Sequence, residues 1–209
     1  MRVFDESFWD ERYRSAPAIW SGRPNAQLVA EVTDPPAGSA LDAGCGEGGD
    51  ALWLADRGWE VTAVDLSRVA LDRAAGHAAE RIPGSAGRIR WVHADLTTWQ
   101  PPAASFDLVS THFLHLPSGT REPVFAGLAA AVAPGGTLLV VAHDPSDLHT
   151  TMQRPHLPDL FFTAQEVAAS LDPDTWEVVV AEARTRTATD HEGREVTIAD
   201  AVLRARRRP

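Results

Sequence analysis

Short apolar runs alternate with amphipathic segments along most of the chain. The runs are rich in Val, Ile, Leu and Ala and are bounded by glycine, proline or acidic residues, which is typical of buried strands. They span residues 39–41, 60–64, 89–94, 106–110 and 137–142. Apolar residues at helical spacing lie before and between these runs, over residues 25–32, 50–57, 67–81 and 121–132. Alternating strands and helices predict a mostly parallel sheet that is covered on both faces.

The two ends of the chain depart from this alternation. Residues 4–15 predict a short helix with an aromatic face, and residues 163–171 predict another short helix. Residues 176–186 and 195–206 read as two strands joined by a turn at 190–193, hence as an antiparallel hairpin. The predicted fold class is therefore α/β, with a Rossmann-like, open, seven-stranded sheet that closes with this hairpin.

The chain has 209 residues, which is enough for one α/β domain with a full core. We expect a single domain over residues 1–209, with a helical cap over residues 1–37. Residues 143–162 are irregular and contain three prolines. A loop of this length in a compact domain is usually functional, so we expect it to form a lid over the substrate.

Charge and cysteine content narrow the classes of partner. The net charge is -10, and an acidic surface repels phosphate backbones, which disfavours nucleic acid as a partner. Cys45 is the single cysteine, so no internal disulfide forms. The first residues are acidic and lack an apolar leader, and no apolar run is long enough to span a membrane. We expect a cytoplasmic monomer or homodimer without a membrane partner.

Residues 40–50 read as a strand end, a glycine-rich turn and the start of a helix. Gly44, Gly46 and Gly49 satisfy G-x-G-x-x-G, and Asp65 ends the next apolar run. A glycine turn with an acid at the next strand tip is typical of a nucleoside site. This pattern also fits an NAD(P)-dependent oxidoreductase, which we keep as an alternative.

Three features disfavour a dinucleotide. Asp42 lies two residues before Gly44, where a carboxylate repels a pyrophosphate but attracts an ammonium group. Asp95 ends the third apolar run, where it can accept a hydrogen bond from an adenine amino group. The sheet also closes with a hairpin in place of a second mononucleotide-binding half.

These residues resemble the class I S-adenosylmethionine-dependent methyltransferases. Residues 42–48 match the D-x-G-x-G-x-G motif of that family, and Asp65 matches its acid after strand two. Asp95 with Leu96 matches the acid–apolar pair after strand three, and residues 134–136 match the P-G-G turn before strand five. Residues 9–13, with Trp20 and Pro24-Asn25, resemble the small tellurite-resistance and thiopurine-type branch.

The resemblance implies a role for each motif residue. Asp42 and the turn backbone would hold the methionine ammonium, Asp65 the ribose hydroxyls, and Asp95 the adenine amino group. S-adenosylmethionine is the implied cofactor and S-adenosylhomocysteine its product. The implied cofactor-binding residues are Trp20, Asp42, Ala43, Gly44, Cys45, Gly46, Asp65, Leu66, Ser67, Asp95, Leu96 and Thr111.

The fourth apolar run is followed by Thr111, His112 and His115, where acceptor and methyl group usually meet in this family. His112 is our first candidate for a general base and His115 our second, because imidazole titrates near neutrality. Either histidine could instead only line the pocket, since a soft nucleophile needs little help from a base. The predicted reaction is in-line methyl transfer to a sulfur, selenium, tellurium, nitrogen or oxygen atom of a small molecule.

Two further interpretations stay open. The loop after residue 142 is rich in metal-ligand residues, but their spacing matches no recognised motif, so we predict no metal. These residues are His143, Asp144, His149 and His156. The chain could also be a protein that binds S-adenosylmethionine without catalysing transfer.

Overall fold

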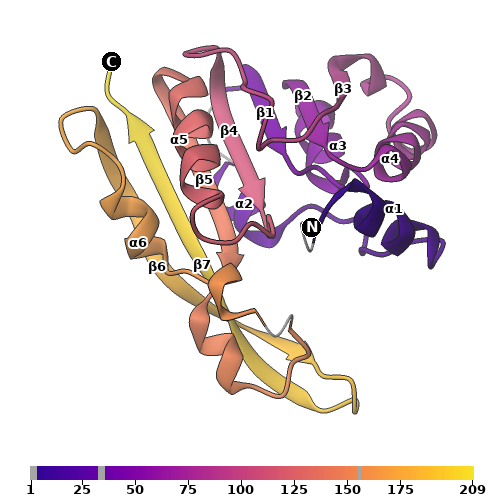
Figure 1. Cartoon of the computed structure of the whole chain (residues 1–209). Helices are drawn as coiled ribbons and strands as arrows, with labels where there is room; N and C mark the ends of the chain where they lie inside the picture. The colour runs from indigo at the N-terminus through magenta and orange to yellow at the C-terminus, as the bar shows by residue number, and fades with distance from the viewer. Residues whose placement is uncertain (1–3, 33–35, 155–156) are drawn as a thin grey trace.

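The computed structural model describes residues 4–32, 36–154 and 157–209. Its sheet has seven strands in the order β3-β2-β1-β4-β5-β7-β6, of which β7 and β6 are antiparallel to their neighbours. The strands are β1 (Ser39–Ala43), β2 (Glu60–Asp65), β3 (Ile89–His93), β4 (Phe106–His112), β5 (Val132–His143), β6 (Trp176–Thr189) and β7 (Glu195–Arg207). The predicted fold class, including the closing hairpin, is confirmed (Figure 1).

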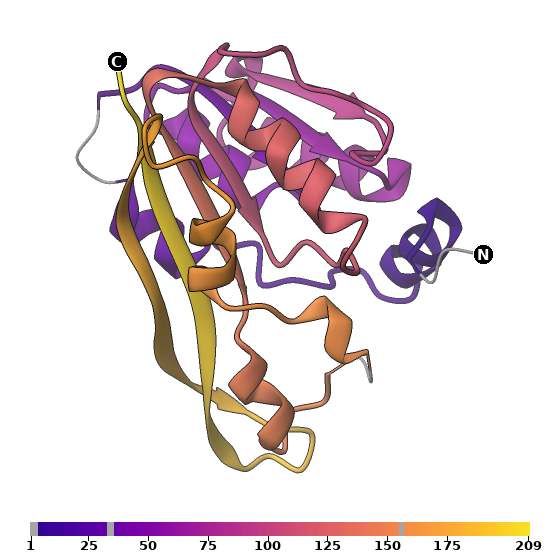
Figure 2. The ribbon, with the colours of Figure 1, turned by 60° about the vertical axis from the view of Figure 1, so that its left-hand side comes forward.

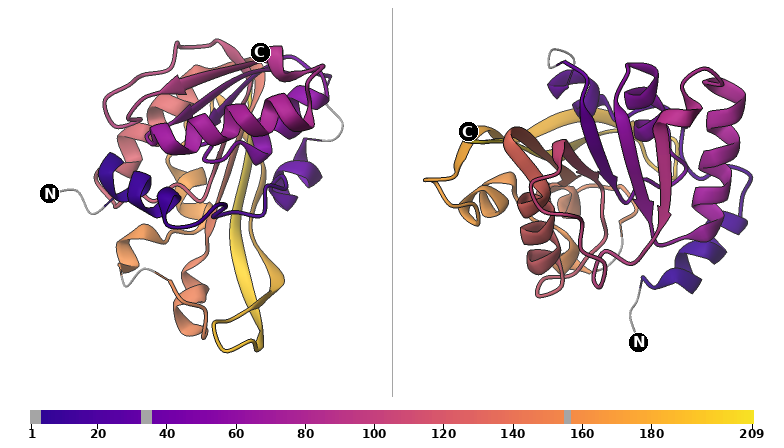
Figure 3. Two further views of the ribbon diagram at one scale, coloured as in Figure 1. Left: turned by 90° about the vertical axis from the view of Figure 1, so that its right-hand side faces the viewer. Right: turned by 90° about the horizontal axis from the view of Figure 1, so that it is seen from above.

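Helices cover both faces of this sheet, as Figure 3 shows from above. One face carries α2 (Ala26–Glu31), α3 (Gly49–Asp56) and α4 (Arg68–Arg81), and the other carries α5 (Arg121–Ala131) and α6 (Ala164–Ala169). The short α1 (Glu6–Arg14) lies against the start of α4.

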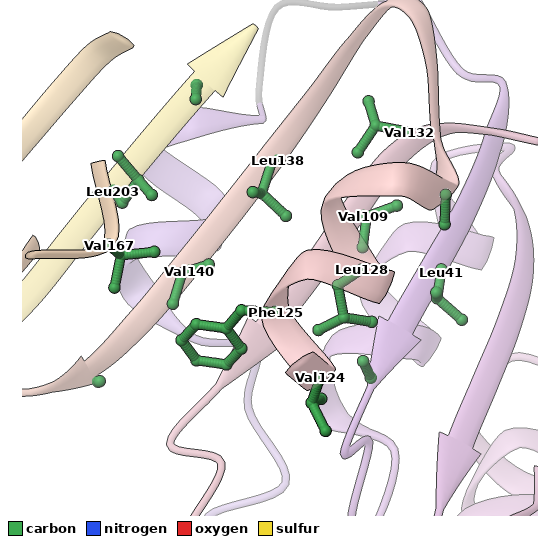
Figure 4. Packing of buried hydrophobic residues seen from close by; sticks show 14 of the residues in the cluster. Leu41, Val109, Val124, Phe125, Leu128, Val132, Leu138, Val140, Val167 and Leu203 are labelled. Atoms are coloured by element: carbon green, nitrogen blue, oxygen red, sulfur yellow. The ribbon is translucent and has the colours of Figure 1, made fainter. Parts of the chain in front are cut away.

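The core has two halves because successive strand residues point to opposite faces. Leu138 and Val140 of β5 pack beneath α5 and α6, whereas Leu139 and Val141 pack toward α2, α3 and α4. Figure 4 shows the first half, where Phe125 and Leu128 of α5 lie over the sheet. Strands that are apolar on both faces explain why their sequence runs are continuous rather than alternating.

Several strand limits differ from the sequence prediction, and two of the differences involve motif residues. β4 continues to His112, so Thr111 and His112 belong to the strand end rather than to the loop behind it. β5 begins at Val132, and residues 134–136 lie within it. The pairing with β4 shifts there, from Phe106↔Val132 to Leu108↔Thr137, which the left-handed Gly135 (φ 80°) accommodates.

The loop over residues 143–162 is fastened to the hairpin. It contains two short 3-10 helices, η2 (Pro145–His149) and η3 (Pro158–Leu160). Asp147 of η2 accepts a hydrogen bond from the backbone N–H of Ala199 at 2.8 Å, and Thr151 donates to Asp190 at 2.7 Å. Figure 2 shows the loop beside the far half of β6 and β7, beyond the carboxyl ends of β4 and β5. The segment is therefore a wall attached to the hairpin, and its role as a lid remains a prediction.

The N-terminal segment is also held to the domain. Asn25 caps α2, as predicted, through a hydrogen bond from the backbone N–H of Gln27. Asp10 of α1 accepts a hydrogen bond from Ser67, the N-cap of α4, at 2.6 Å. The break predicted between that helix and the first strand falls partly on residues 33–35, which lie outside the described residues. The cap over residues 1–37 stays a prediction.

Candidate functional site

The glycine turn, residues 44–49, follows β1 at the carboxyl edge of the sheet. Its backbone bends through three glycines at positive φ: Gly44 (80°), Gly46 (52°) and Gly48 (83°). The N–H groups of Gly44 and Cys45 donate to the carbonyl of Val64 in β2, at 2.8 and 3.0 Å. Only glycine adopts such a series without strain, so the motif fixes both the shape of the turn and its place beside β2.

Asp65 ends β2 and holds the turn through its side chain. One carboxylate oxygen accepts the backbone N–H of Gly46 and the other that of Ser67, each at 2.8 Å. The carboxylate is partly buried, and this burial raises the pKa of Asp65 despite those hydrogen bonds. The structure therefore brings Asp65, the turn and the N-cap of α4 together, as the sequence predicted.

Asp42, Asp50 and His112 form a second group beneath the turn, which we call the acid–histidine cluster. Each offers one nitrogen or oxygen atom, and these atoms lie within 4.8 Å of one another. Asp50, in the first turn of α3, accepts the backbone N–H of Asn25 at 2.6 Å and lies 2.9 Å from Nδ1 of His112. The His112 side chain is only 6% exposed. Asp42 was predicted from the sequence, whereas Asp50 was missed because no motif marks its position.

The protonation state of Asp42 sets the net charge of this cluster. With Asp42 ionised, two carboxylates and one imidazolium leave one negative charge in excess, whereas with Asp42 protonated the charges of Asp50 and His112 cancel. Burial, and then the neighbouring Asp50, raise the pKa of Asp42 to about 8. The pKa of His112 is also raised, since the adjacent Asp50 and Asp42 outweigh the effect of burial. Within the described part of the chain, Oδ2 of Asp42 has no hydrogen-bond partner. A cation beside this unpaired, buried oxygen would favour the ionised form of Asp42 and balance its charge, so the cluster fits a cationic group such as the ammonium of S-adenosylmethionine.

Glu47 lies within the turn and is a site residue that the sequence analysis missed. Its Oε2 accepts the backbone N–H groups of Ile19 and Trp20, both at 3.1 Å, and its Oε1 pairs with Arg73 at 2.9 Å. Its burial is nearly complete at 4% exposure. Glu47 therefore holds the N-terminal segment over the turn. The sequence did contain a signal for this role, because a charged residue such as Glu47 inside a buried glycine turn needs partners.

Trp20 lies at the edge of the turn, as predicted. Its indole Nε1 donates to the hydroxyl of Tyr13 at 3.1 Å, and a Cβ built on Gly46 would lie 3.5 Å from that nitrogen. The indole is 47% exposed, so one side faces away from the protein. Cys45 is buried, and burial raises the pKa of its thiol well above the ordinary value, which agrees with a filler and not a nucleophile.

The predicted adenine-binding residues lie at the far end of the turn. Asp95 forms a local turn in which Oδ1 accepts both the backbone N–H and the hydroxyl of Thr97, at 2.8 and 2.6 Å. Leu96 is buried, and the Leu66 backbone carbonyl lies 2.9 Å from Nε2 of His93. These contacts fix the loop shape, and the roles of Leu66, Asp95 and Leu96 toward a cofactor stay predictions.

A small hollow, which we call the ring pocket, lies behind the carboxyl ends of β4 and β5. Its volume is about 10 Å³, and it is lined by Phe113, Leu114, His115, Ala142, His143, Leu160 and Phe161. Burial, followed by the nearby guanidinium groups of Arg12 and Arg154, lowers the pKa of His115. His115 thus lies in this hollow, whereas His112 faces the acid–histidine cluster. Thr111 is buried between them.

A larger hollow of about 480 Å³ lies elsewhere, between α5 and α6. It is lined by residues such as Arg121, Phe125 and Trp176, and none of the predicted site residues lies in it. Cavity size alone would thus misplace the site.

The loop histidines do not converge. Among the described residues, the acid–histidine cluster is the single group of three side chains within metal-ligand distance of one another, and it includes neither His143 nor His149. His156 lies outside the described residues. Within the described ranges, no helix is long and apolar enough to cross a bilayer.

Comparison with known proteins identifies the family. Residues 40–136 match the methyltransferase domain family. The chain is 30% identical over 160 residues to the 2-heptyl-1-hydroxyquinolin-4(1H)-one methyltransferase of Mycobacteroides abscessus, covering 74% of this chain and 69% of that protein. It is 36% identical over 128 residues to the trans-aconitate 2-methyltransferase of Rhizobium meliloti, which covers 60% of this chain but only 46% of that protein.

Solved structures share the fold at lower identity. TehB from Haemophilus influenzae superposes with a TM-score of 0.69 at 19% identity, over 98% of this chain and 67% of that one. The family match decides against the oxidoreductase that the glycine pattern also allowed. The resemblance predicted from residues 42–48, Asp65 and Asp95 is confirmed: the chain belongs to the class I S-adenosylmethionine-dependent methyltransferases.

Proposed function

We propose that the enzyme transfers the methyl group of S-adenosylmethionine to a small molecule that binds at the ring pocket. This proposal rests on the contact between the ring pocket and the glycine turn. Leu114 lines the ring pocket, and a Cβ built on Gly44 would lie 3.1 Å from Leu114 Cδ1. A cofactor on the turn and an acceptor in the pocket would therefore be neighbours, as in-line displacement requires.

The chain's own residues fit the cofactor. The unpaired Asp42 oxygen, and the excess negative charge that the acid–histidine cluster gains when Asp42 ionises, suit the ammonium group. Asp65 suits the ribose hydroxyls, because a partly buried carboxylate forms strong charge-assisted hydrogen bonds. When bound, the cofactor would supply a methyl carbon on a cationic sulfur. A lone pair of the acceptor atom would form the new bond to this carbon while the carbon–sulfur bond breaks. The acceptor's proton would leave to a base or to water.

The geometry favours His115 over His112 as that base. His112 lies 2.9 Å from Asp50 and is 6% exposed, which suits a residue that balances charge beneath the cofactor. His115 lies in the ring pocket and its lowered pKa keeps it neutral near pH 7, in the form that accepts a proton. We therefore reverse the order of preference given by the sequence.

The acceptor class follows from the relatives and from charge. The two named relatives methylate a hydroxyquinolone and trans-aconitate, both of which are small molecules. A net charge of -10 disfavours nucleic acid. The N-terminal cap and the loop over residues 143–162 flank the pocket and would shield the reaction from water. The oligomeric state and a cytoplasmic location stay predictions.

Two measurements test the proposal. Calorimetry with S-adenosylhomocysteine should show binding, whereas NAD should not bind. A coupled assay of S-adenosylhomocysteine release, run against thiol, amine, hydroxyl and carboxylate acceptors, should show turnover that requires the acceptor. Binding of the cofactor without turnover on any acceptor would argue against a catalytic role for the ring pocket.

A further inference from the structure

Three separate segments contribute the rings that line the ring pocket, and Trp9 of α1 packs beside one of them, His115. The Phe113 and His143 ring centroids lie 4.5 Å apart with planes 30° apart, and His143 lies 6.2 Å from Phe161. On its other side His115 lies 5.6 Å from Trp9 and 6.1 Å from His143. Rings at these separations interact favourably through offset and tilted contacts, so the pocket favours flat, polarisable groups.

Phe113 is held in a backbone conformation that a phenylalanine rarely adopts. Its φ is 54°, and its backbone N–H donates to the carbonyl of Val141 at 2.8 Å. A bulky residue at positive φ is strained, and such strain persists where the surrounding structure requires it. Here it turns the chain directly after β4, and Phe113, Leu114 and His115 all line the pocket. The strain points to a function for this ring's position.

His143 lines the same pocket, and its ring carries an unsatisfied polar atom. Among the described residues its buried Nδ1 has no hydrogen-bond partner, and the nearest carboxylate oxygen, on Asp147, is 3.8 Å away. Burial, and then the positive charge of Arg154, lower the pKa of His143 to about 3, so the ring is neutral at pH 7. A neutral imidazole nitrogen either donates or accepts, depending on its tautomer. A hydroxyl group does both and would satisfy Nδ1 in either case.

Of the arginines near the pocket, Arg154 and Arg186 are already paired, and Arg12 is exposed and does not line the pocket. Arg154 donates to Asp147 through Nη2 at 2.6 Å and through Nε at 3.1 Å, and Arg186 lies 2.9 Å from Asp200. A polyanionic ligand would have to compete with these carboxylates. The lining therefore suits an uncharged ligand better than an anionic one.

We propose that the ring pocket recognises a planar aromatic acceptor that bears a hydroxyl group, with its ring against Phe113 and Phe161 and its hydroxyl on Nδ1 of His143. This inference rests on the proposed function and adds the acceptor's chemical class. The present hollow of about 10 Å³ holds no more than one water, so the acceptor enters by displacing the side chain of Leu160, the last residue of η3. His143 is a positioning residue that fixes the acceptor's orientation.

The test measures binding to the full chain saturated with S-adenosylhomocysteine. The probes are 2-naphthol, 2-methoxynaphthalene, which lacks the donor, and decahydro-2-naphthol, which lacks the aromatic ring. We expect 2-naphthol to bind at least tenfold more tightly than either analogue. Equal affinities, or tighter binding of an aliphatic polycarboxylate such as trans-aconitate, would overturn the inference.

Variants test separately the proposed contact with the hydroxyl group and the proposed contact with the aromatic ring. His143→Phe keeps a ring without the polar atom and should remove the preference over 2-methoxynaphthalene, whereas His143→Gln should restore part of it. Phe161→Leu should remove the preference over decahydro-2-naphthol. Phe125→Leu, which removes a ring between α5 and α6, is the matched control and should leave both preferences intact.

The outcome is separable from the proposed function. S-adenosylhomocysteine affinity is measured for every variant and should match that of the parent protein. Thermal unfolding shows that each variant is folded, with a lower melting temperature for buried truncations such as Phe125→Leu. If the parent protein fails to bind S-adenosylhomocysteine, the proposed function is wrong. If it binds the cofactor product but ignores the ring and the hydroxyl of the probes, only the acceptor class is wrong.

Discussion

The glycine turn and the ring pocket are neighbours that share Leu114, yet different contacts hold them. The turn is fixed by backbone N–H groups that donate to the Val64 carbonyl and the Asp65 carboxylate, at 2.8 to 3.0 Å. The pocket is formed by side-chain rings 4.5 to 6.2 Å apart, with a polar atom left unpaired. The first region is preorganised, whereas the second must open to admit an acceptor. We therefore expect the proposed cofactor half of the site to keep one shape, and the proposed acceptor half to carry the specificity.

The largest effect should come from the acid–histidine cluster. His112→Ala leaves the carboxylates of Asp42 and Asp50 facing each other without a cation, and breaking a buried ion pair costs ~3 kcal/mol or more of unfolding free energy. Chemical denaturation measures the loss. His77→Ala is the control, because His77 is a half-buried histidine on α4 outside the cluster. An unchanged unfolding free energy for His112→Ala would mean that the cluster is not ionised as described.

The same variant separates two roles for His112. If His112 balances charge beneath the cofactor, His112→Ala should weaken S-adenosylhomocysteine binding and leave the pH profile of turnover unchanged. If instead it is the general base, cofactor affinity should hold while turnover falls most steeply at low pH. Calorimetry and a pH–rate profile on the same preparation distinguish these outcomes.

Asp65→Ala should come next in size. It removes the acceptor for the Gly46 and Ser67 N–H groups and the proposed partner of the ribose, so S-adenosylhomocysteine affinity should fall by about 1.5–3 kcal/mol, the range for hydrogen bonds to a charged group. Calorimetry provides the measurement. Asp72→Ala on the exposed side of α4 is the control. Affinity equal to that of the control would remove Asp65 from the cofactor site.

The pH dependence of stability should show the charge of the cluster. The folded-state pKa of Asp42 lies near 8, far above its ordinary 3.8, so its contribution to stability is lost as pH rises between these values. The raised pKa of His112 acts in the same direction, because its stabilisation is present below 6.5 and lost as pH rises through its folded-state value. The melting temperature of the free protein should therefore fall from pH 5 to pH 8, as ~1.4 kcal/mol per pKa unit is lost.

The cofactor's ammonium should offset this loss. Saturation with S-adenosylhomocysteine should flatten the pH dependence of the melting temperature, and Asp42→Asn should flatten it without any ligand. Differential scanning fluorimetry over this pH range measures both. A free-protein melting temperature that rises with pH would show that Asp42 is ionised in the folded state.

We expect the smallest effect on stability from a substitution in the loop over residues 143–162, beside the ring pocket. Thr151→Val removes the hydrogen bond to Asp190 and should cost about 1 kcal/mol of stability. It should raise the KM for the acceptor while leaving S-adenosylhomocysteine affinity unchanged, because the contact lies far from the glycine turn. Thr197→Val, on an exposed part of β7, serves as the control. A change in cofactor affinity would mean that the wall also shapes the cofactor site.

The fold and the family could be predicted from the sequence, and the sequence also proposes a cofactor site around the glycine turn. These predictions were possible because the position of the glycine turn depends on local backbone geometry. The positions of Asp42, Asp65 and Asp95 depend on where the strands end, and the spacing of apolar residues indicates those ends. Only the tertiary structure decided that Asp50 lies against His112, that Glu47 holds Trp20, and that Phe113, His143 and Phe161 share one pocket with His115. Those contacts join residues from separate segments of the chain, and their identity depends on crossover packing and side-chain direction. One chain's pattern of polar and apolar residues does not encode such a choice, because many partners are compatible with each position.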